Sequence, residues 1–183
     1  MGLLYDSGVK DAVTYRLALL EKTPRAKTVL ALAAEKAGWG QPLPERVGRG
    51  VSLQFAFATY MAQVAEVDVS KDGTVRVRRV VCAVDCGTVV NPDTVRAQIQ
   101  SAIMFGITAA LHGEITLKDG RVEQTNFDSY QILRMNEAPA VEVHIVQSPE
   151  SPGGMGEAGT SAIIPAVTNR PLNFSPADRS ERI

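Results

Sequence analysis

The chain has 183 residues, of which 45% are hydrophobic and 21% are charged, and its formal net charge is -1. This balance is typical of one globular domain, and the scattered basic residues argue against nucleic acid or an anionic membrane as a partner. No apolar run reaches the roughly 18 residues of a membrane-spanning helix, and the N-terminus lacks a signal-peptide pattern. We therefore expect a cytoplasmic chain; an export signal of a longer parent protein would lie outside it.

Two helices and a loop are predicted at the start of the chain. Residues 11–22 carry apolar side chains at helical spacing. Residues 25–37 are rich in Ala and Leu and end before Gly38, which suits a helix C-cap. The glycines and prolines of residues 38–50 predict a loop.

The middle of the chain has the alternating pattern of strands. Residues 63–70 and 74–84 flank a Lys-Asp-Gly turn and predict a hairpin. The run at 80–84 is apolar on both faces, which predicts a strand that enters the core. A second Lys-Asp-Gly turn predicts another hairpin within residues 113–127, and alternation predicts a strand at 140–146.

Two further helices complete the expected fold. Asn91 as N-cap and Pro92 at the first position open a helix over residues 91–111. One face of that helix is rich in small residues, namely Val95, Ile99, Ala102, Gly106 and Ala109. Residues 160–169 read as the start of a last helix. Hairpins and helices without a regular βαβ order predict an α+β fold class.

The two cysteines, Cys82 and Cys86, have C-x3-C spacing, and the only histidines are His112 and His144. Without a second cysteine pair, this is a weak signal for zinc. The favoured interpretation is that the cysteines pack as small apolar residues.

The segment "SPGGMGEAGT" at 151–160 places Glu157 among four glycines. One interpretation is a surface loop with an acid near a helix start, where the helix dipole favours it. The other is a ligand site, in which glycines let a ligand approach the backbone and the carboxylate acts as a general base. The segment is neither a Walker loop nor a dinucleotide fingerprint.

The stretch "AVDCGTVVNPDTVRAQIQ" at 83–100 also has two interpretations. It is either an ordinary strand–turn–helix connection or a binding turn. In the second case, Gln98 would offer a ligand both a donor and an acceptor.

Two motifs, "VVCAVDCGTVVNPDTVRAQI" and "GGMGEAGTSAIIPAVTN", separated by the segment that contains residues 113–146, carry a resemblance. Together they resemble the C-terminal end of the large, molybdopterin-binding subunit of the xanthine oxidase and aldehyde oxidase family. Within that family they resemble the isoquinoline 1-oxidoreductase β subunit branch. The resemblance covers about residues 10–169.

The resemblance implies a chemistry and a site. Members of this family hydroxylate a carbon next to nitrogen in an aromatic heterocycle, or an aldehyde carbon, with oxygen from water. Glu157 matches the family's catalytic base, and Gln98 matches a glutamine near the pterin. The same cleft would be lined by Gly156, Ala158, Gly159, Thr160 and Ser161. The molybdenum is held by the pterin, in its cytosine dinucleotide form in this branch, so no side-chain metal ligand is expected. The [2Fe-2S] clusters are expected on an iron–sulfur small subunit.

The chain departs from the family in length and at its end. The family subunit is several times longer, and residues 170–183 are polar with a helix-stopping Pro171. We therefore divide the chain into the family portion, 1–169, and a divergent tail, 170–183, whose order is left open.

Three hypotheses follow from these departures. The chain is part of a split molybdenum hydroxylase that needs a complementary chain, or it is a folded but inactive fragment. Alternatively, it is a small α+β binding module whose glycine loop takes another ligand. A truncated subunit would expose the small-residue face of helix 91–111, which predicts a homo-oligomer. The identity of the heterocyclic or aldehyde substrate stays open.

Overall fold

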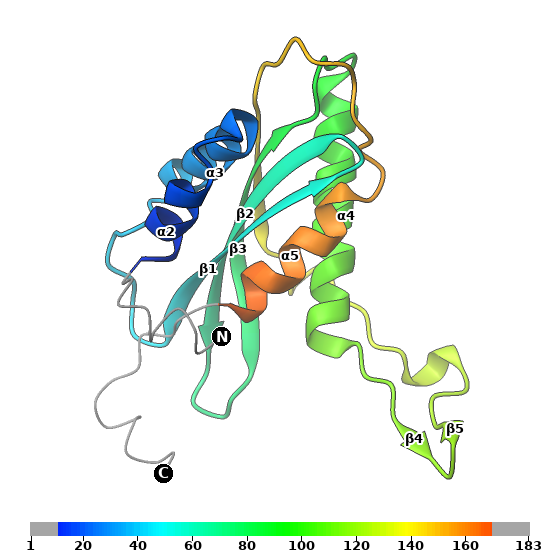
Figure 1. Cartoon of the computed structure of the whole chain (residues 1–183). Coiled ribbons are helices and arrows are strands. Elements are labelled where there is room, and N and C mark those ends of the chain that lie inside the picture. The colour runs from blue at the N-terminus through cyan, green and yellow to red at the C-terminus, as the bar shows by residue number, and fades with distance from the viewer. Residues whose placement is uncertain (1–10, 170–183) are drawn as a thin grey trace.

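The computed structural model describes residues 11–169, which form a four-stranded mixed sheet with helices on both faces (Figure 1). The strand order is β1-β2-β3-β6, with β1 at Val47–Ala56, β2 at Thr59–Val69, β3 at Val75–Asp85 and β6 at Ala140–Ile145. The first three strands are antiparallel, and β6 runs parallel to β3. The predicted α+β class is confirmed. The tail 170–183, with Pro171, lies outside the described residues.

The helices form two layers, one on each side of the sheet (Figure 1). Helices α2, Ala12–Leu19, and α3, Pro24–Lys36, cover one face. Helices α4, Pro92–His112, and α5, Ala158–Thr168, cover the other face. All four helices were predicted, and the N-cap of α4 is Asn91, whose side chain accepts from two backbone N–H groups.

The second half of strand β3, residues 80–85, is buried on both of its faces because it lies between the two helical layers. Val81 and Ala83 belong to the core under α2 and α3. Val80, Cys82 and Val84 belong to the core under α4 and α5. This sandwiched position explains why the alternation of the sequence fades into an unbroken apolar run.

Both cysteines lie in the apolar core, where the sequence pattern had placed them. Complete burial raises the pKa of the Cys82 thiol to about 12. Since the thiolate is the reactive form of cysteine, this side chain acts as a small apolar residue.

Strand β1 was not predicted, and its first residues fall in the segment expected to be a loop. Gly48 and Gly50 hide the alternation because they have no side chain. The two-residue turn to β2 also lacks the usual Asn, Asp or Gly. Phe57 and Ala58 both adopt left-handed backbone conformations there, with φ of 54° and 62°.

The middle of the small-residue face of α4 is covered by α5 in the same chain, so the expectation that this face would be exposed is wrong there, while Val95 is half-buried and Ala109 is exposed. Ile99, Ala102 and Gly106 are buried. A Cβ added at Gly106 would lie 2.6 Å from the carbonyl oxygen of Thr160. The small residues on this face let the backbones of α4 and α5 approach each other closely.

Residues 113–139, which we name the arm, extend away from the sheet (Figure 1). The predicted hairpin at the second Lys-Asp-Gly turn is present, but its strands are short: β4 is Leu117–Lys118 and β5 is Arg121–Val122. One turn of 3-10 helix follows at Phe127–Ser129.

An ion pair between a partly exposed arginine and a buried aspartate ties α3 to the end of β3. Asp85 is 2% exposed, and its two carboxylate oxygens accept from Nε and Nη2 of Arg25, each at 2.7 Å. The same carboxylate accepts from the backbone N–H of Gly87 at 3.1 Å. The guanidinium group of Arg25 also lies over the ring of Tyr60, 5.0 Å from its centroid. Hydrogen bonding from Arg25 holds the pKa of Asp85 below its usual value.

We expect Arg25→Ala to lower the free energy of unfolding by about 3 kcal/mol, because it leaves a buried carboxylate without its counter-charge. Urea denaturation at neutral pH measures this. The control is Arg96→Ala, which removes an exposed pair with Asp93 and should change stability by less than about 1 kcal/mol. The pKa of Asp85 is lower in the folded protein than in the unfolded chain. The difference in free energy of unfolding between the wild type and Arg25→Ala is therefore present above the unfolded pKa of about 3.9. It is lost as the pH falls through the folded pKa. A difference that persists in acid would contradict the assignment.

Candidate functional site

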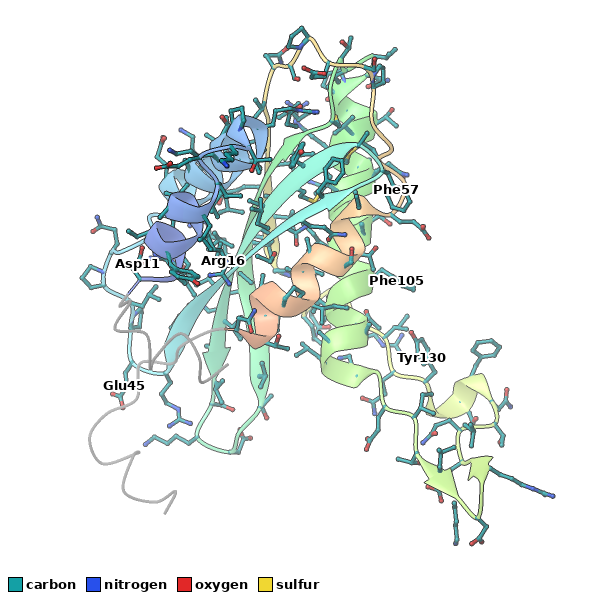
Figure 2. All side chains as sticks on the ribbon, in the orientation of Figure 1. Asp11, Arg16, Glu45, Phe57, Phe105 and Tyr130 are labelled. Atoms are coloured by element: carbon teal, nitrogen blue, oxygen red, sulfur yellow. The ribbon has the colours of Figure 1, made fainter. Side chains whose placement is uncertain are left out.

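An open groove of about 560 Å³ lies where α4, the end of β1 and the start of α5 meet. It is lined by Gln54, Ala56, Phe57, Gln98, Ser101, Ala102, Phe105, Gly156, Glu157, Thr160 and Ser161. Figure 2 shows Phe57 beside the end of the β1–β2 hairpin and Phe105 beside α4. Both rings are exposed although they are apolar, at 61% and 64%. The groove therefore combines aromatic surface with amide, hydroxyl and carboxylate groups.

Glu157 occupies the N-cap position of α5, and its side chain makes no capping hydrogen bond. Its backbone carbonyl accepts from the N–H of Thr160 at 3.0 Å, which closes the first helical turn. The carboxylate is exposed at the groove and is therefore available to a ligand. Gln98 reaches the same groove from α4.

The structure brings together five of the seven residues expected in the site: Gln98, Gly156, Glu157, Thr160 and Ser161. The other two, Ala158 and Gly159, do not line the groove. Ala158 is 2% exposed and belongs to the core under α4 and α5. Gly159 is buried against α4, where an added Cβ would lie 2.9 Å from that of Ala102. These two residues support the groove from beneath.

The glycines before Glu157 serve the fold more than the ligand. The N–H of Gly153 donates to the carbonyl of Cys86 at 2.8 Å, and that of Gly154 to the carbonyl of Phe57 at 2.7 Å. A Cβ at Gly154 would come within 2.8 Å of the Cβ of Phe57. An added Cβ at Gly156 would meet no atom within 4 Å. The expectation that the glycines admit a ligand therefore fits Gly156 alone.

The turn after β3 supports the glycine segment from behind. Gly87 has a φ of 73°, and an added Cβ would lie 2.7 Å from the carbonyl oxygen of Glu150. The N–H of Thr88 donates to that same carbonyl at 2.8 Å. Residues 83–100 were one candidate for a binding turn. Gln98 of this stretch lines the groove, whereas the turn at Gly87 and Thr88 packs against the chain at Glu150.

Six lining residues of the groove were not predicted: Gln54, Ala56, Phe57, Ser101, Ala102 and Phe105. A signal for three of them was present, because Ser101, Ala102 and Phe105 follow Gln98 at i+3, i+4 and i+7 on the same helical face. The other three lie at the end of β1 and in its turn, so they were lost with that strand.

The groove suits the polar edges of a pterin or a neutral ring. Amide and hydroxyl side chains can pair with ring nitrogens and carbonyl groups. No Lys or Arg is among the lining residues of the groove. Within residues 11–169 there is no cluster of three or more His, Cys, Asp or Glu side chains that could hold a metal ion.

A family model described as a molybdopterin cofactor-binding domain matches residues 18–139. Since this match covers most of the chain, the protein belongs to that family, which is found in the large subunits of molybdenum hydroxylases of the xanthine oxidase type. Glu157 lies beyond the matched residues.

Relatives of similar sequence are components of larger enzymes. The β subunit of isoquinoline 1-oxidoreductase from Brevundimonas diminuta is 35% identical over 164 residues, which cover 87% of this chain and 21% of that protein. A nicotinate dehydrogenase subunit from Pseudomonas putida is 32% identical over 190 residues, covering 91% of this chain and 16% of that protein. The chain thus spans about a fifth of the length of these relatives.

A solved structure shares the fold. Quinoline 2-oxidoreductase from Pseudomonas putida 86 superposes with a TM-score of 0.56 and 26% identity, covering 60% of this chain and 15% of that chain.

None of the helices within residues 11–169 combines the length and apolar character needed to cross a membrane.

We expect Gly87→Ala to destabilise the protein by about 3 kcal/mol, because it adds both a left-handed alanine and a backbone clash. The matched control is Gly156→Ala in the facing loop, where the added methyl group meets open space and should cost less than about 0.5 kcal/mol. Urea denaturation measures both. Equal losses for the two variants would contradict the supporting role of this turn.

Proposed function

We propose that this chain is part of a molybdenum hydroxylase that oxidises an N-heterocycle or an aldehyde, with Glu157 as the base. One observation carries the proposal. In a chain of the molybdopterin cofactor-binding family, an exposed carboxylate and an exposed amide from distant segments face one groove. When bound, the molybdenum cofactor supplies a two-electron acceptor for hydroxylation with oxygen from water.

Glu157 is suited to accept a proton at the groove. An ionised carboxylate is a pure acceptor, and no hydrogen bond from a capping interaction occupies it. Its place at the N-cap of α5 fixes the backbone while the side chain projects from the helix end. General-base catalysis of this kind contributes about 10²- to 10⁴-fold in rate.

Gln98, Thr160 and Ser161 are suited to hold and orient the pterin. A glutamine amide offers a donor pair and an acceptor, and each hydroxyl offers both. The hydroxyl of Ser161 donates to Oε1 of Gln54 at 2.8 Å, which joins α5 to β1 across the groove margin. The cytosine dinucleotide form of the cofactor is the form we propose.

The rest of the large subunit, or a complementary chain, completes the site in this proposal. The groove is open, and catalysis of this class requires exclusion of water and close positioning of reactants. An iron–sulfur small subunit with [2Fe-2S] clusters would take the electrons. The isolated chain is therefore inactive in our proposal.

The arm supports a larger assembly because its apolar side chains are uncovered. They are Ile115, Leu117, Val122, Phe127, Tyr130, Ile132 and Met135. Phe127 and Met135 are 88% and 95% exposed. Apolar side chains gathered on one projecting segment are typical of an interaction surface.

The cofactor content of the chain tests this proposal. The chain is expressed in a host that makes the cofactor, first alone and then together with a truncated Brevundimonas diminuta β subunit. The truncation removes the portion of that subunit that matches this chain. We expect the chain alone to hold substoichiometric molybdenum and pterin and the combination to hold more. In the combination with the iron–sulfur subunit, Glu157→Gln should keep the metal and lose about 10²- to 10⁴-fold in hydroxylation rate.

The control for this substitution is Glu114→Gln, the same change at an exposed acid of the arm. It should retain both metal and rate. Wild-type rates in Glu157→Gln would remove its role as base. A combination that folds and holds no cofactor would instead favour a binding module without catalysis.

A separate prediction concerns self-association of the isolated chain. Without its partner the arm remains exposed, so we expect sedimentation to show oligomers at micromolar concentration that dissociate in the double variant Phe127→Ser, Met135→Ser. Leu19→Ser is the control, because Leu19 is a similarly exposed apolar residue outside the arm. A monomeric wild type, or equal effects of control and arm variants, would contradict it.

A further inference from the structure

Five polar side chains are buried within residues 11–169: Ser52, Thr59, Gln63, Asp85 and Thr108. Three of these five come from the β1–β2 hairpin, and each donates to a backbone carbonyl of the segment that carries Glu157. Asp85 and Thr108 are engaged elsewhere, in the Arg25 ion pair and in the α4–arm connection.

Gln63 and Ser52 form a pair that reaches α5. They lie directly opposite each other in the register of β1 and β2. Nε2 of Gln63 donates to the carbonyl of Gly159 at 3.1 Å, and the Ser52 hydroxyl donates to that of Ala162 at 2.5 Å. These two carbonyls lie three residues apart, on adjacent turns of one helix face.

Stability alone does not account for Gln63. It is 0% exposed, and its Oε1 is buried without a hydrogen-bond partner. A buried unsatisfied acceptor is destabilising, and an apolar side chain of similar length would avoid it. Nε2 of Gln63 also donates to Sδ of Met61 at 3.2 Å, and of these two hydrogen bonds the one to Gly159 reaches α5. The position therefore favours a polar group.

Apolar packing leaves the placement of α5 less defined. Its contacts with α4 combine small residues with isoleucines such as Ile163, which contacts Gly106, and apolar attraction has no directional preference. A hydrogen bond requires both a distance and an angle. Two such bonds to adjacent turns of α5 therefore define its rotation and its position along its axis.

We infer that Gln63 and Ser52 are positioning residues for Glu157: by fixing the register of α5 against the sheet, they set where its N-cap carboxylate enters the groove. The catalytic meaning of this inference rests on the proposed function. The hydrogen bonds themselves can be tested on the chain without any cofactor, so the two ideas can fail separately.

The test uses Gln63→Met in the full chain, because methionine keeps the length of the side chain and removes both donor and unpaired acceptor. Amide hydrogen exchange by NMR should accelerate about five-fold at residues 162–164, the loss expected for one net hydrogen bond. Exchange in α3 should not change, and the melting temperature should not fall. The ¹³C shift of the Gly159 carbonyl should move upfield as its donor is lost.

Two further variants complete the design. Ser52→Ala should accelerate the same α5 amides, and it serves as the test if Gln63→Met fails to fold. Gln131→Met, the same substitution at an exposed site, should leave α5 unchanged. Unchanged α5 exchange in both variants would overturn the inference. So would a lower melting temperature with acceleration throughout the chain, because that is the result for an ordinary core residue.

Discussion

The close approach of α5 to its neighbours is the constraint on which the rest of the structure depends. Gly106 and Gly159 bring the backbones of α4 and α5 together, since a methyl group at either position would clash. The sheet holds α5 from the other side by hydrogen bonds to its carbonyls. Because α5 is held on both sides, its N-cap residue, Glu157, lies at the groove that Gln98 also lines.

The same constraint explains the composition of the glycine segment. Gly153 and Gly154 pack so closely against the β1–β2 turn that a side chain at either position would clash. Their N–H groups donate hydrogen bonds within the protein. A glycine-rich loop beside a carboxylate therefore need not be built of ligand-binding backbone. Here Gly153, Gly154 and Gly159 allow close packing within the protein, and only Gly156 of this segment faces open space.

The helices, both Lys-Asp-Gly hairpins and the last strand could be predicted because local patterns of caps, turns and periodicity mark them. Glu157 and Gln98 could be named because their motifs resemble a family. Strand β1 could not be found, since its glycines and its Phe57–Ala58 turn carry no local signal. The cover over the small face of α4 also required the tertiary structure, because a face that accepts a helix and an exposed face look alike in sequence.

The Phe57–Ala58 turn has a consequence for how the chain folds. Two left-handed non-glycine residues cost about 1 kcal/mol or more each, so the hairpin gains little from its own turn. Its stabilising partners come from far along the chain: the Thr59 hydroxyl donates to the carbonyl of Gly154, 95 residues away. Contacts of such sequence separation form slowly because a long loop must close first. This contact beside the groove can therefore form only after synthesis has passed the glycine segment.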